Sequence, residues 1–194
     1  MRLAYTLTKN LTPKLRTKDK WVVLDRDGVI NYDTKHYIKT PSEWIPIPGA
    51  LPSIAKSNKT GHKIIVISNQ SVVGRGLITM DAFNQIHNYM IDQIQSYGGE
   101  IEKAYYCFHG PDEKCLCRKP NVGLLENAAS EFSIQSFVDV PVVGDKQSDI
   151  ELALNVNAIP IYIKNPMYSI NKSIKDQIQK SYITLEDFAH DWTS

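Results

Sequence analysis

Long hydrophobic runs are missing from this sequence of 194 residues. No apolar stretch approaches the roughly 18 residues that a membrane-spanning helix needs. The first residues lack the hydrophobic segment of a secretory signal. Neither sign of charge is in excess, because the formal net charge is +1. These absences argue against a membrane protein and predict a cytoplasmic protein without membrane contact.

The charge is unevenly distributed along the chain. Residues 1–20 carry six Lys or Arg and one Asp, a net of +5 against +1 for the whole chain, which leaves the remainder at −4. A slightly acidic body without a basic, aromatic-rich track is a poor match for nucleic acid. We therefore predict a basic N-terminal extension over residues 1–20 and one domain over residues 21–194 that binds no nucleic acid.

Short apolar runs alternate with helical patterns through this domain. The runs predict buried strands, and Thr79, Ser148 and Thr184 stand where helices would be capped. The pattern indicates an α/β fold with a doubly wound, mostly parallel sheet and helices on both faces. Ligands bind such folds at the carboxyl ends of the strands. The predicted strands are Trp21–Leu24, His62–Ile67, Glu102–Tyr106, Val140–Val143 and Ile159–Ile163.

The first predicted strand ends in Asp25-Arg-Asp-Gly28, which places two carboxylates at a sharp turn. An aspartate with an ordinary pKa is ionised at neutral pH, so Asp25 is expected to act as a nucleophile without a base. Asp27 can protonate a leaving alkoxide and later deprotonate water. Two such charges repel a phosphate unless a cation lies between them, and Mg²⁺ is the usual cation.

The fourth predicted strand ends in Gly144-Asp-Lys-Gln-Ser-Asp149 and supplies further carboxylates. Asp145 is the third expected protein ligand of Mg²⁺. Asp149 is expected to support the site as an N-cap or as a partner of the ligands.

Phosphate-binding groups are expected at two other places. Arg118 and Lys119 offer a guanidinium fork and a point charge, and Pro120 holds the chain directly after them. The second predicted strand ends in hydroxyl and carboxamide groups, which are suitable donors to phosphate oxygens. These groups belong to Ser68, Asn69, Gln70 and Ser71.

The only three cysteines cluster around a histidine, in the order Cys107-x-His109-x₅-Cys115-x-Cys117. Three thiols cannot all pair with one another, and a cytoplasmic location disfavours disulfides. Three thiolates and one imidazole complete a tetrahedral zinc shell with no open position. The cluster therefore predicts a small loop around a structural Zn²⁺, which would direct Arg118 and Lys119 toward the site.

The order Asp-x-Asp-Gly, strand with terminal Ser, Lys, then Gly-Asp-x₃-Asp resembles the four motifs of the haloacid dehalogenase-like phosphatases. The resemblance covers residues 21–163. Within this superfamily, LDRDGVIN, SNQS and CxHxxxxxCxCRKP look like the branch of the heptose bisphosphate and histidinol-phosphate phosphatases. The longer stretch DRDGVIN…PSEWIPIPGAL…CFHGPDEKCLCRKP is most similar to the heptose enzymes.

The resemblance implies roles for particular residues. Asp25 would be the nucleophile, and Asp27 the acid/base that also coordinates Mg²⁺ through its backbone carbonyl. Ser68 and Lys119 would hold the transferring phosphoryl group, and Asp145 would complete the Mg²⁺ site. The residues implied in substrate binding are Asp33, Arg118, Lys146 and the loop from Ser68 to Ser71.

Three positions depart from the family pattern. Ser68 stands where Thr is usual, Phe108 where Pro is common, and Val122-Gly-Leu124 where Pro-Gly-Met is common. These departures bear on specificity more than on chemistry. The gaps between the motifs leave no room for a large cap domain, so the segment Asn31–Trp44 and the zinc loop are expected to serve as the lid.

The implied function is removal of the C7 phosphate of D-glycero-D-manno-heptose 1,7-bisphosphate, for heptose supply to lipopolysaccharide or another glycan, by a monomer. Three alternatives stay open at this point: a histidinol-phosphate phosphatase, a zinc-bearing nucleic-acid module with 3′-phosphatase activity, and a catalytically inactive binding protein.

Overall fold

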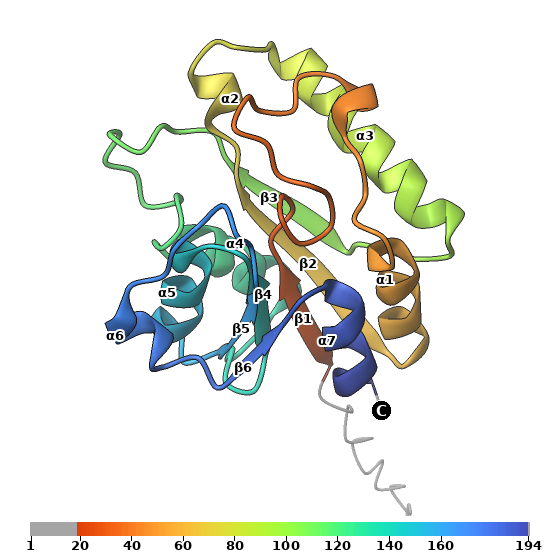
Figure 1. The fold of residues 1–194 in the computed structure, drawn as a ribbon, viewed down its shortest axis with the longest axis vertical. Helices are drawn as coiled ribbons and strands as arrows, with labels where there is room; N and C mark the ends of the chain where they lie inside the picture. The colour runs from red at the N-terminus through yellow and green to blue at the C-terminus, as the bar shows by residue number, and fades with distance from the viewer. Residues whose placement is uncertain (1–18, 194) are drawn as a thin grey trace, which may run out of the picture.

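The computed structural model describes residues 19–193, so most of the predicted basic extension lies outside the described residues. Six parallel strands form one sheet in the order β3-β2-β1-β4-β5-β6. Their order confirms the predicted parallel α/β fold (Figure 1). The strands are β1 (Lys20–Leu24), β2 (His62–Asn69), β3 (Lys103–Cys107), β4 (Pro141–Gly144), β5 (Ile159–Ile163) and β6 (Lys180–Tyr182).

The sheet separates two hydrophobic cores, because successive residues of a strand point to opposite faces. In β1, Val22 and Leu24 pack with helices α1, α3 and α7, whereas Trp21 and Val23 pack with α4 and α5. Figure 1 shows the two sets of helices on either side of the sheet. The helices are η1 (Pro41–Glu43), α1 (Ala50–Lys59), α2 (Ser71–Gly74), α3 (Met80–Ser96), α4 (Gly123–Phe132), α5 (Gln147–Asn155), α6 (Lys172–Lys175) and α7 (Leu185–Trp192).

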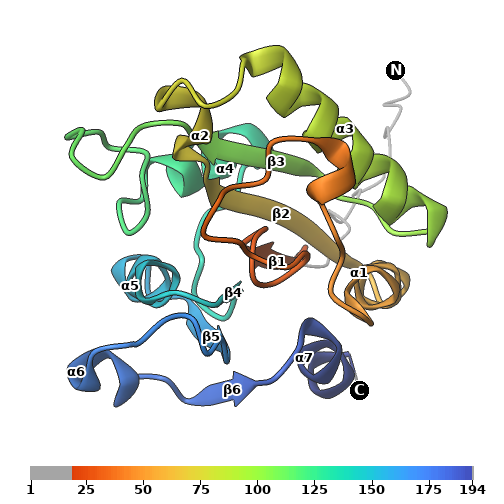
Figure 2. The same cartoon turned by 45° about the horizontal axis from the view of Figure 1, so that its top comes forward.

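The strand order reverses at β1. The chain adds β2 and β3 on one side of β1 and then β4, β5 and β6 on the other side (Figure 2). Such a reversal opens a crevice beyond the carboxyl ends of the two central strands. Leu24 lies beside Val143 in the register, so the residues that follow these two strands meet at that crevice. The topology therefore brings Asp25 next to Asp145.

All five predicted strands are present, and the caps of two helices are as expected. The Thr79 hydroxyl accepts the Ala82 backbone N–H, and Thr184 caps α7 in a capping box. The prediction that Ser148 caps α5 was wrong. The helix begins one residue before Ser148, at Gln147, because the Asp149 carboxylate accepts the backbone N–H of Lys146 and makes Lys146 the N-cap.

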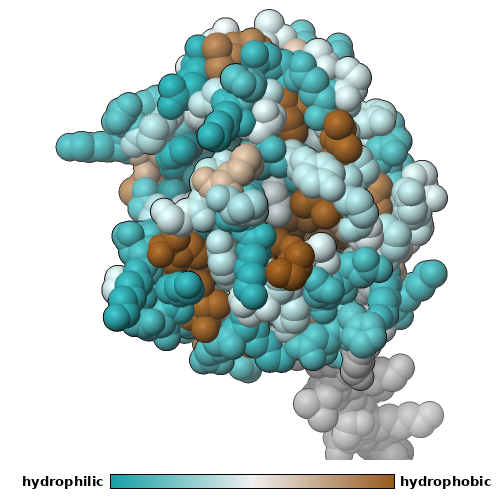
Figure 3. Space-filling model, in the orientation of Figure 1, coloured by the Kyte–Doolittle hydropathy of each residue, from teal (hydrophilic) through white to brown (hydrophobic). Residues whose placement is uncertain are grey.

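The described residues contain no cap domain, and only short segments border the crevice. No helix among residues 19–193 is long and apolar enough to span a bilayer. On the face shown in Figure 3, hydrophobic groups are separated by hydrophilic ones.

Candidate active site

Asp25 lies at the tip of β1, where its backbone N–H donates to the Val143 carbonyl at 2.9 Å. Its side chain is buried, and the Oδ1 atom accepts the Arg26 backbone N–H at 2.7 Å. The same oxygen lies 2.9 Å from Lys119 Nζ. The expected nucleophile is therefore a carboxylate held rigidly at the floor of the crevice.

Lys119 reaches this point from the loop after the cysteine cluster. Its ammonium group contacts Asp25, lies 2.6 Å from Asp149 Oδ1 and donates to the Ile67 carbonyl at 2.7 Å. Burial alone would lower the pKa of Lys119, but the charges of Asp149 and Asp25 outweigh it and raise that pKa. A permanent positive charge consequently lies beside the candidate nucleophile.

Asp25, Asp145 and Asp149 form a buried acidic cluster in which one oxygen of each lies within 4.8 Å of the others. Burial raises the pKa of Asp145 to about 8, although Lys146 opposes the shift, and the charges of Asp25 and Asp149 add to it. The Asp145 Oδ1 atom is buried without a hydrogen-bond partner among the described residues. An unsatisfied carboxylate oxygen in an oxygen-only cluster fits a hard divalent cation such as Mg²⁺.

Asp27 is not part of this cluster and lies instead in a network of hydrogen-bond donors. Arg26 places Nε and Nη2 at 2.9 Å from its two oxygens, and Gln70 and Asn31 donate to it at 2.7 and 2.8 Å. Burial would raise the pKa of Asp27, but the charge and hydrogen bonds of Arg26 lower it, with help from Asn31 and Gln70. The sequence analysis did not single out the fully buried Arg26, because it occupies the variable position between the two aspartates of the motif.

The four predicted polar residues at the end of β2 and the start of α2 have different partners. Gln70 links the two motifs by donating to both Asp27 and Ser68 Oγ, the latter at 3.0 Å. Asn69 instead holds the backbone of Lys119, accepting its N–H at 3.0 Å and donating to its carbonyl at 3.2 Å. The Ser71 hydroxyl contacts Arg75 Nε at 3.4 Å.

A cavity of about 270 Å³ is lined by Asn69, Gln70 and Ser71, whereas the buried Asp25, Ser68, Lys119 and Asp145 are not among its lining residues. It brings together seven of the predicted site residues, namely Asp27, Asp33, Asn69, Gln70, Ser71, Arg118 and Lys146. The segment Asp33–Ile38 forms one wall, in agreement with the expected lid. The sequence analysis missed Lys35, Arg75 and Tyr168, because none of them belongs to a motif.

The outer wall of the cavity is held by a polar cluster. Lys146 Nζ lies 2.8 Å from Asp33 Oδ2, which also accepts the Tyr168 hydroxyl at 2.6 Å. The same ammonium lies 4.8 Å from the centre of the Tyr168 ring. Burial would lower the pKa of Lys146, but the charges of Asp25, Asp145 and Asp33 raise it, so this wall presents a cation to the cavity.

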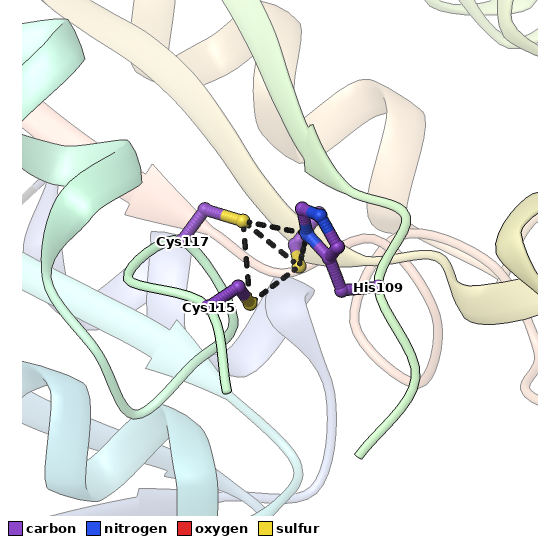
Figure 4. Close-up of side chains that lie close together, drawn as sticks. His109, Cys115 and Cys117 are labelled. Carbon is purple, nitrogen blue, oxygen red and sulfur yellow. Dashed lines mark hydrogen bonds between the residues drawn. The ribbon is translucent and has the colours of Figure 1, made fainter. Parts of the chain in front are cut away.

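The four predicted zinc ligands converge at the end of β3 and in the loop that follows it, and Figure 4 shows the side chains of His109, Cys115 and Cys117 turned toward one another. Three sulfur pairs lie 3.2–3.7 Å apart. His109 Nδ1 lies 3.2 Å from Cys117 and 3.6 Å from Cys107. A tetrahedral zinc shell has ligand atoms about 3.5–3.8 Å apart, so this donor set fits the ion. The adjoining Arg118 Nη1 donates to the His109 carbonyl at 3.0 Å.

Sequence comparisons agree with this geometry. A family described as "Polynucleotide kinase 3 phosphatase" matches residues 20–149, and one described as "HAD-hydrolase-like" matches residues 116–190. D-glycero-beta-D-manno-heptose-1,7-bisphosphate 7-phosphatase of Pseudomonas putida is 43% identical over 75% of this chain and 82% of its own length. The protein of the same name from Helicobacter pylori is 33% identical over 88% and 94%.

A solved structure is also similar. The crystal structure of D,D-heptose 1,7-bisphosphate phosphatase from B. bronchiseptica, complexed with magnesium and phosphate, superposes with a TM-score of 0.80. The two chains are 31% identical, and the match covers 89% of this chain and 97% of the other.

The chain therefore belongs to the haloacid dehalogenase-like phosphatases, and it is a phosphatase. Within that class, the relatives reported above are named as heptose bisphosphate phosphatases.

Proposed function

We propose that the protein hydrolyses the C7 phosphate of D-glycero-D-manno-heptose 1,7-bisphosphate through a phosphoryl group carried transiently on Asp25. The observation that carries the proposal is the buried Asp25 carboxylate, which lies 2.9 Å from Lys119 and within 4.8 Å of a carboxylate oxygen of Asp145, a residue whose Oδ1 atom is buried without a hydrogen-bond partner among the described residues. The substrate follows from the relatives, which are up to 43% identical.

Asp25, Asp145 and the backbone carbonyl of Asp27 would hold Mg²⁺, which when bound neutralises charge on the phosphate and the carboxylates. Both side-chain contacts of Asp25 named above are to Oδ1, which supports Oδ2 as the oxygen that would attack phosphorus. Lys119 and the Ser68 hydroxyl would hold the phosphoryl oxygens during transfer. Asp149 keeps Lys119 in place through the contact at 2.6 Å.

Asp27 would exchange protons with the leaving sugar oxygen and then with water. Its four donors hold it as a carboxylate in the resting state, which is the form that the second, hydrolytic step requires. Turning from Arg26 toward the substrate would release it to carry a proton in the first step.

Zinc would hold the loop Cys107–Cys117 and thereby fix Arg118 and Lys119, which follow directly after the last ligand. Arg118 and Lys146 would bind the polar sugar and its second phosphate at the mouth of the cavity, together with Asp33 and the loop from Ser68 to Ser71. We propose residues 21–194 as one catalytic domain that acts as a cytoplasmic monomer without nucleic acid, and residues 1–20 as an appended basic segment.

Steady-state kinetics on purified protein with Mg²⁺ test the proposal. We expect kcat/KM for the heptose bisphosphate to exceed that for histidinol phosphate clearly. The Asp25→Asn variant should fold normally and lose turnover, because an amide cannot attack phosphorus as a carboxylate does. A preference for histidinol phosphate, or an active Asp25→Asn enzyme, would overturn the assignment.

One matching family is described as a polynucleotide 3′-phosphatase, so DNA with a 3′-phosphate should be compared as a substrate. A DNA oligonucleotide with a 3′-phosphate should be a poor substrate, because residues 21–194 carry a net charge of −4, whereas a nucleic-acid backbone is bound by a basic surface. Efficient, salt-dependent hydrolysis of that oligonucleotide would instead favour the nucleic-acid alternative.

A further inference from the structure

We propose that Asn165 is a positioning residue for the metal site, which holds one oxygen of Asp145 so that the other remains available to a divalent cation. The inference rests on the Mg²⁺ site proposed above. Asn165 lies in the loop after β5, 20 residues from Asp145, and no sequence motif includes it. Its Nδ2 donates to Asp145 Oδ2 at 2.6 Å.

The orientation of the Asn165 amide is determined by a second hydrogen bond. Asn165 Oδ1 accepts the backbone N–H of Met167 at 2.9 Å. A flipped amide would place its oxygen against the carboxylate and its NH₂ group against the Met167 N–H, losing both bonds. The side-chain NH₂ group of Asn165 is therefore the group that faces Asp145.

Gly28 restricts Asp145 from another side. A Cβ atom at Gly28 would lie 2.0 Å from Asp145 Oδ2, so the carboxylate packs directly against the turn after β1. With Oδ2 fixed by Asn165 and packed against Gly28, the remaining oxygen has a fixed direction as well. That oxygen, Oδ1, is the buried atom without a hydrogen-bond partner.

A competing partner makes this restraint necessary. Lys146 Nζ lies 3.6 Å from Asp145 Oδ1, too far for a hydrogen bond but close enough to attract the carboxylate. A carboxylate released from Asn165 would turn toward that ammonium group and give up its place in the cluster. Partners of metal ligands commonly change metal affinity about 10- to 100-fold when they are removed.

Binding of Mn²⁺, a stand-in for Mg²⁺ with the same preference for oxygen ligands, can be measured without turnover. Free Mn²⁺ is followed by electron paramagnetic resonance in a titration of each full-length protein. We expect Asn165→Leu to raise the Kd for Mn²⁺ about 10- to 100-fold. The Asn165→Ser variant can still accept the Met167 N–H but is too short to reach Asp145, and it should show the same loss.

Asn58→Leu is the matched control. Asn58 also donates through Nδ2, to the His62 carbonyl at 3.1 Å, and accepts a backbone N–H, from Glu100 at 2.8 Å. It lies near the amino end of β2, away from the acidic cluster. The control should therefore lose comparable stability in a thermal melt and keep the wild-type affinity for Mn²⁺.

The Asp145→Asn variant distinguishes a failure of the proposed metal site from a failure of the positioning role of Asn165. If the wild-type protein and Asp145→Asn bind Mn²⁺ equally, the proposed metal site itself is wrong. If Asp145→Asn loses binding while both Asn165 variants match the Asn58→Leu control, the positioning role is overturned and the metal site stands. If Asn165→Leu fails to fold, the comparison of Asn165→Ser with the control gives the answer.

Discussion

Replacing Gly28 by alanine would disturb the proposed metal site through a single methyl group. Gly28 has φ of +87°, and its added Cβ would lie 2.0 Å from Asp145 Oδ2. The positive φ costs an alanine about 1–2 kcal/mol. The overlap adds the cost of an overpacked site, about 1–3 kcal/mol. We therefore expect Gly28→Ala to lose about 2–5 kcal/mol of unfolding free energy and most of its phosphatase activity.

Gly61→Ala isolates the cost of the backbone. Gly61 has φ of +84°, and nothing lies within 4 Å of its Cβ position. This variant should keep wild-type activity and lose only the backbone term, which corresponds to a melting temperature lowered by about 2–8 °C. Urea unfolding and phosphate release are measured on both variants. If Gly28→Ala matches Gly61→Ala in stability and activity, then Asp145 does not pack as described.

Three further changes follow from the same contacts. Lys119→Met leaves Asp25 and Asp149 buried without their shared cation, so in the presence of chelator it should lose about 3–5 kcal/mol of unfolding free energy in urea titrations. A loss below 1 kcal/mol would contradict the buried ion pairs. The wild-type protein should contain zinc in elemental analysis, and Cys115→Ser should lose that zinc and melt at a lower temperature. Unchanged zinc content would show that the thiol is not a ligand. Burial, with a contribution from the charge of Arg26, lowers the pKa of His87. The unfolded chain therefore binds more protons, and stability should fall as the pH drops below about 6.5. His87→Gln should flatten this dependence between pH 5.5 and 7.5, and an equal slope in both proteins would refute the assignment to His87.

Elements with strong local patterns were predictable from the sequence. Strands β1 to β5 are apolar runs, and α3 has a capping threonine with an apolar stripe, so their positions follow from residues close together in the chain. The short elements β6, α2 and α6 have three or four residues and were missed, because such lengths carry no periodicity. The start of α5 was misplaced because the Asp149 carboxylate accepts the backbone N–H of Lys146, so Lys146 rather than Ser148 is the N-cap.

Some features of the site likewise depend on residues close together in the chain, and others depend on residues far apart in it. The four members of the cysteine cluster lie within eleven residues, so composition and spacing were enough to predict that they come together. The sequence also determined which groups stand at the strand ends, and hence the class of chemistry. The partners of those groups are far away in the chain: Asn165 is 20 residues from Asp145, Asn69 is 50 from Lys119, and Tyr168 is 135 from Asp33. Only the tertiary structure decided these pairs, because strand order and helix packing set which loops meet at the crevice, and no local pattern of side chains records that meeting.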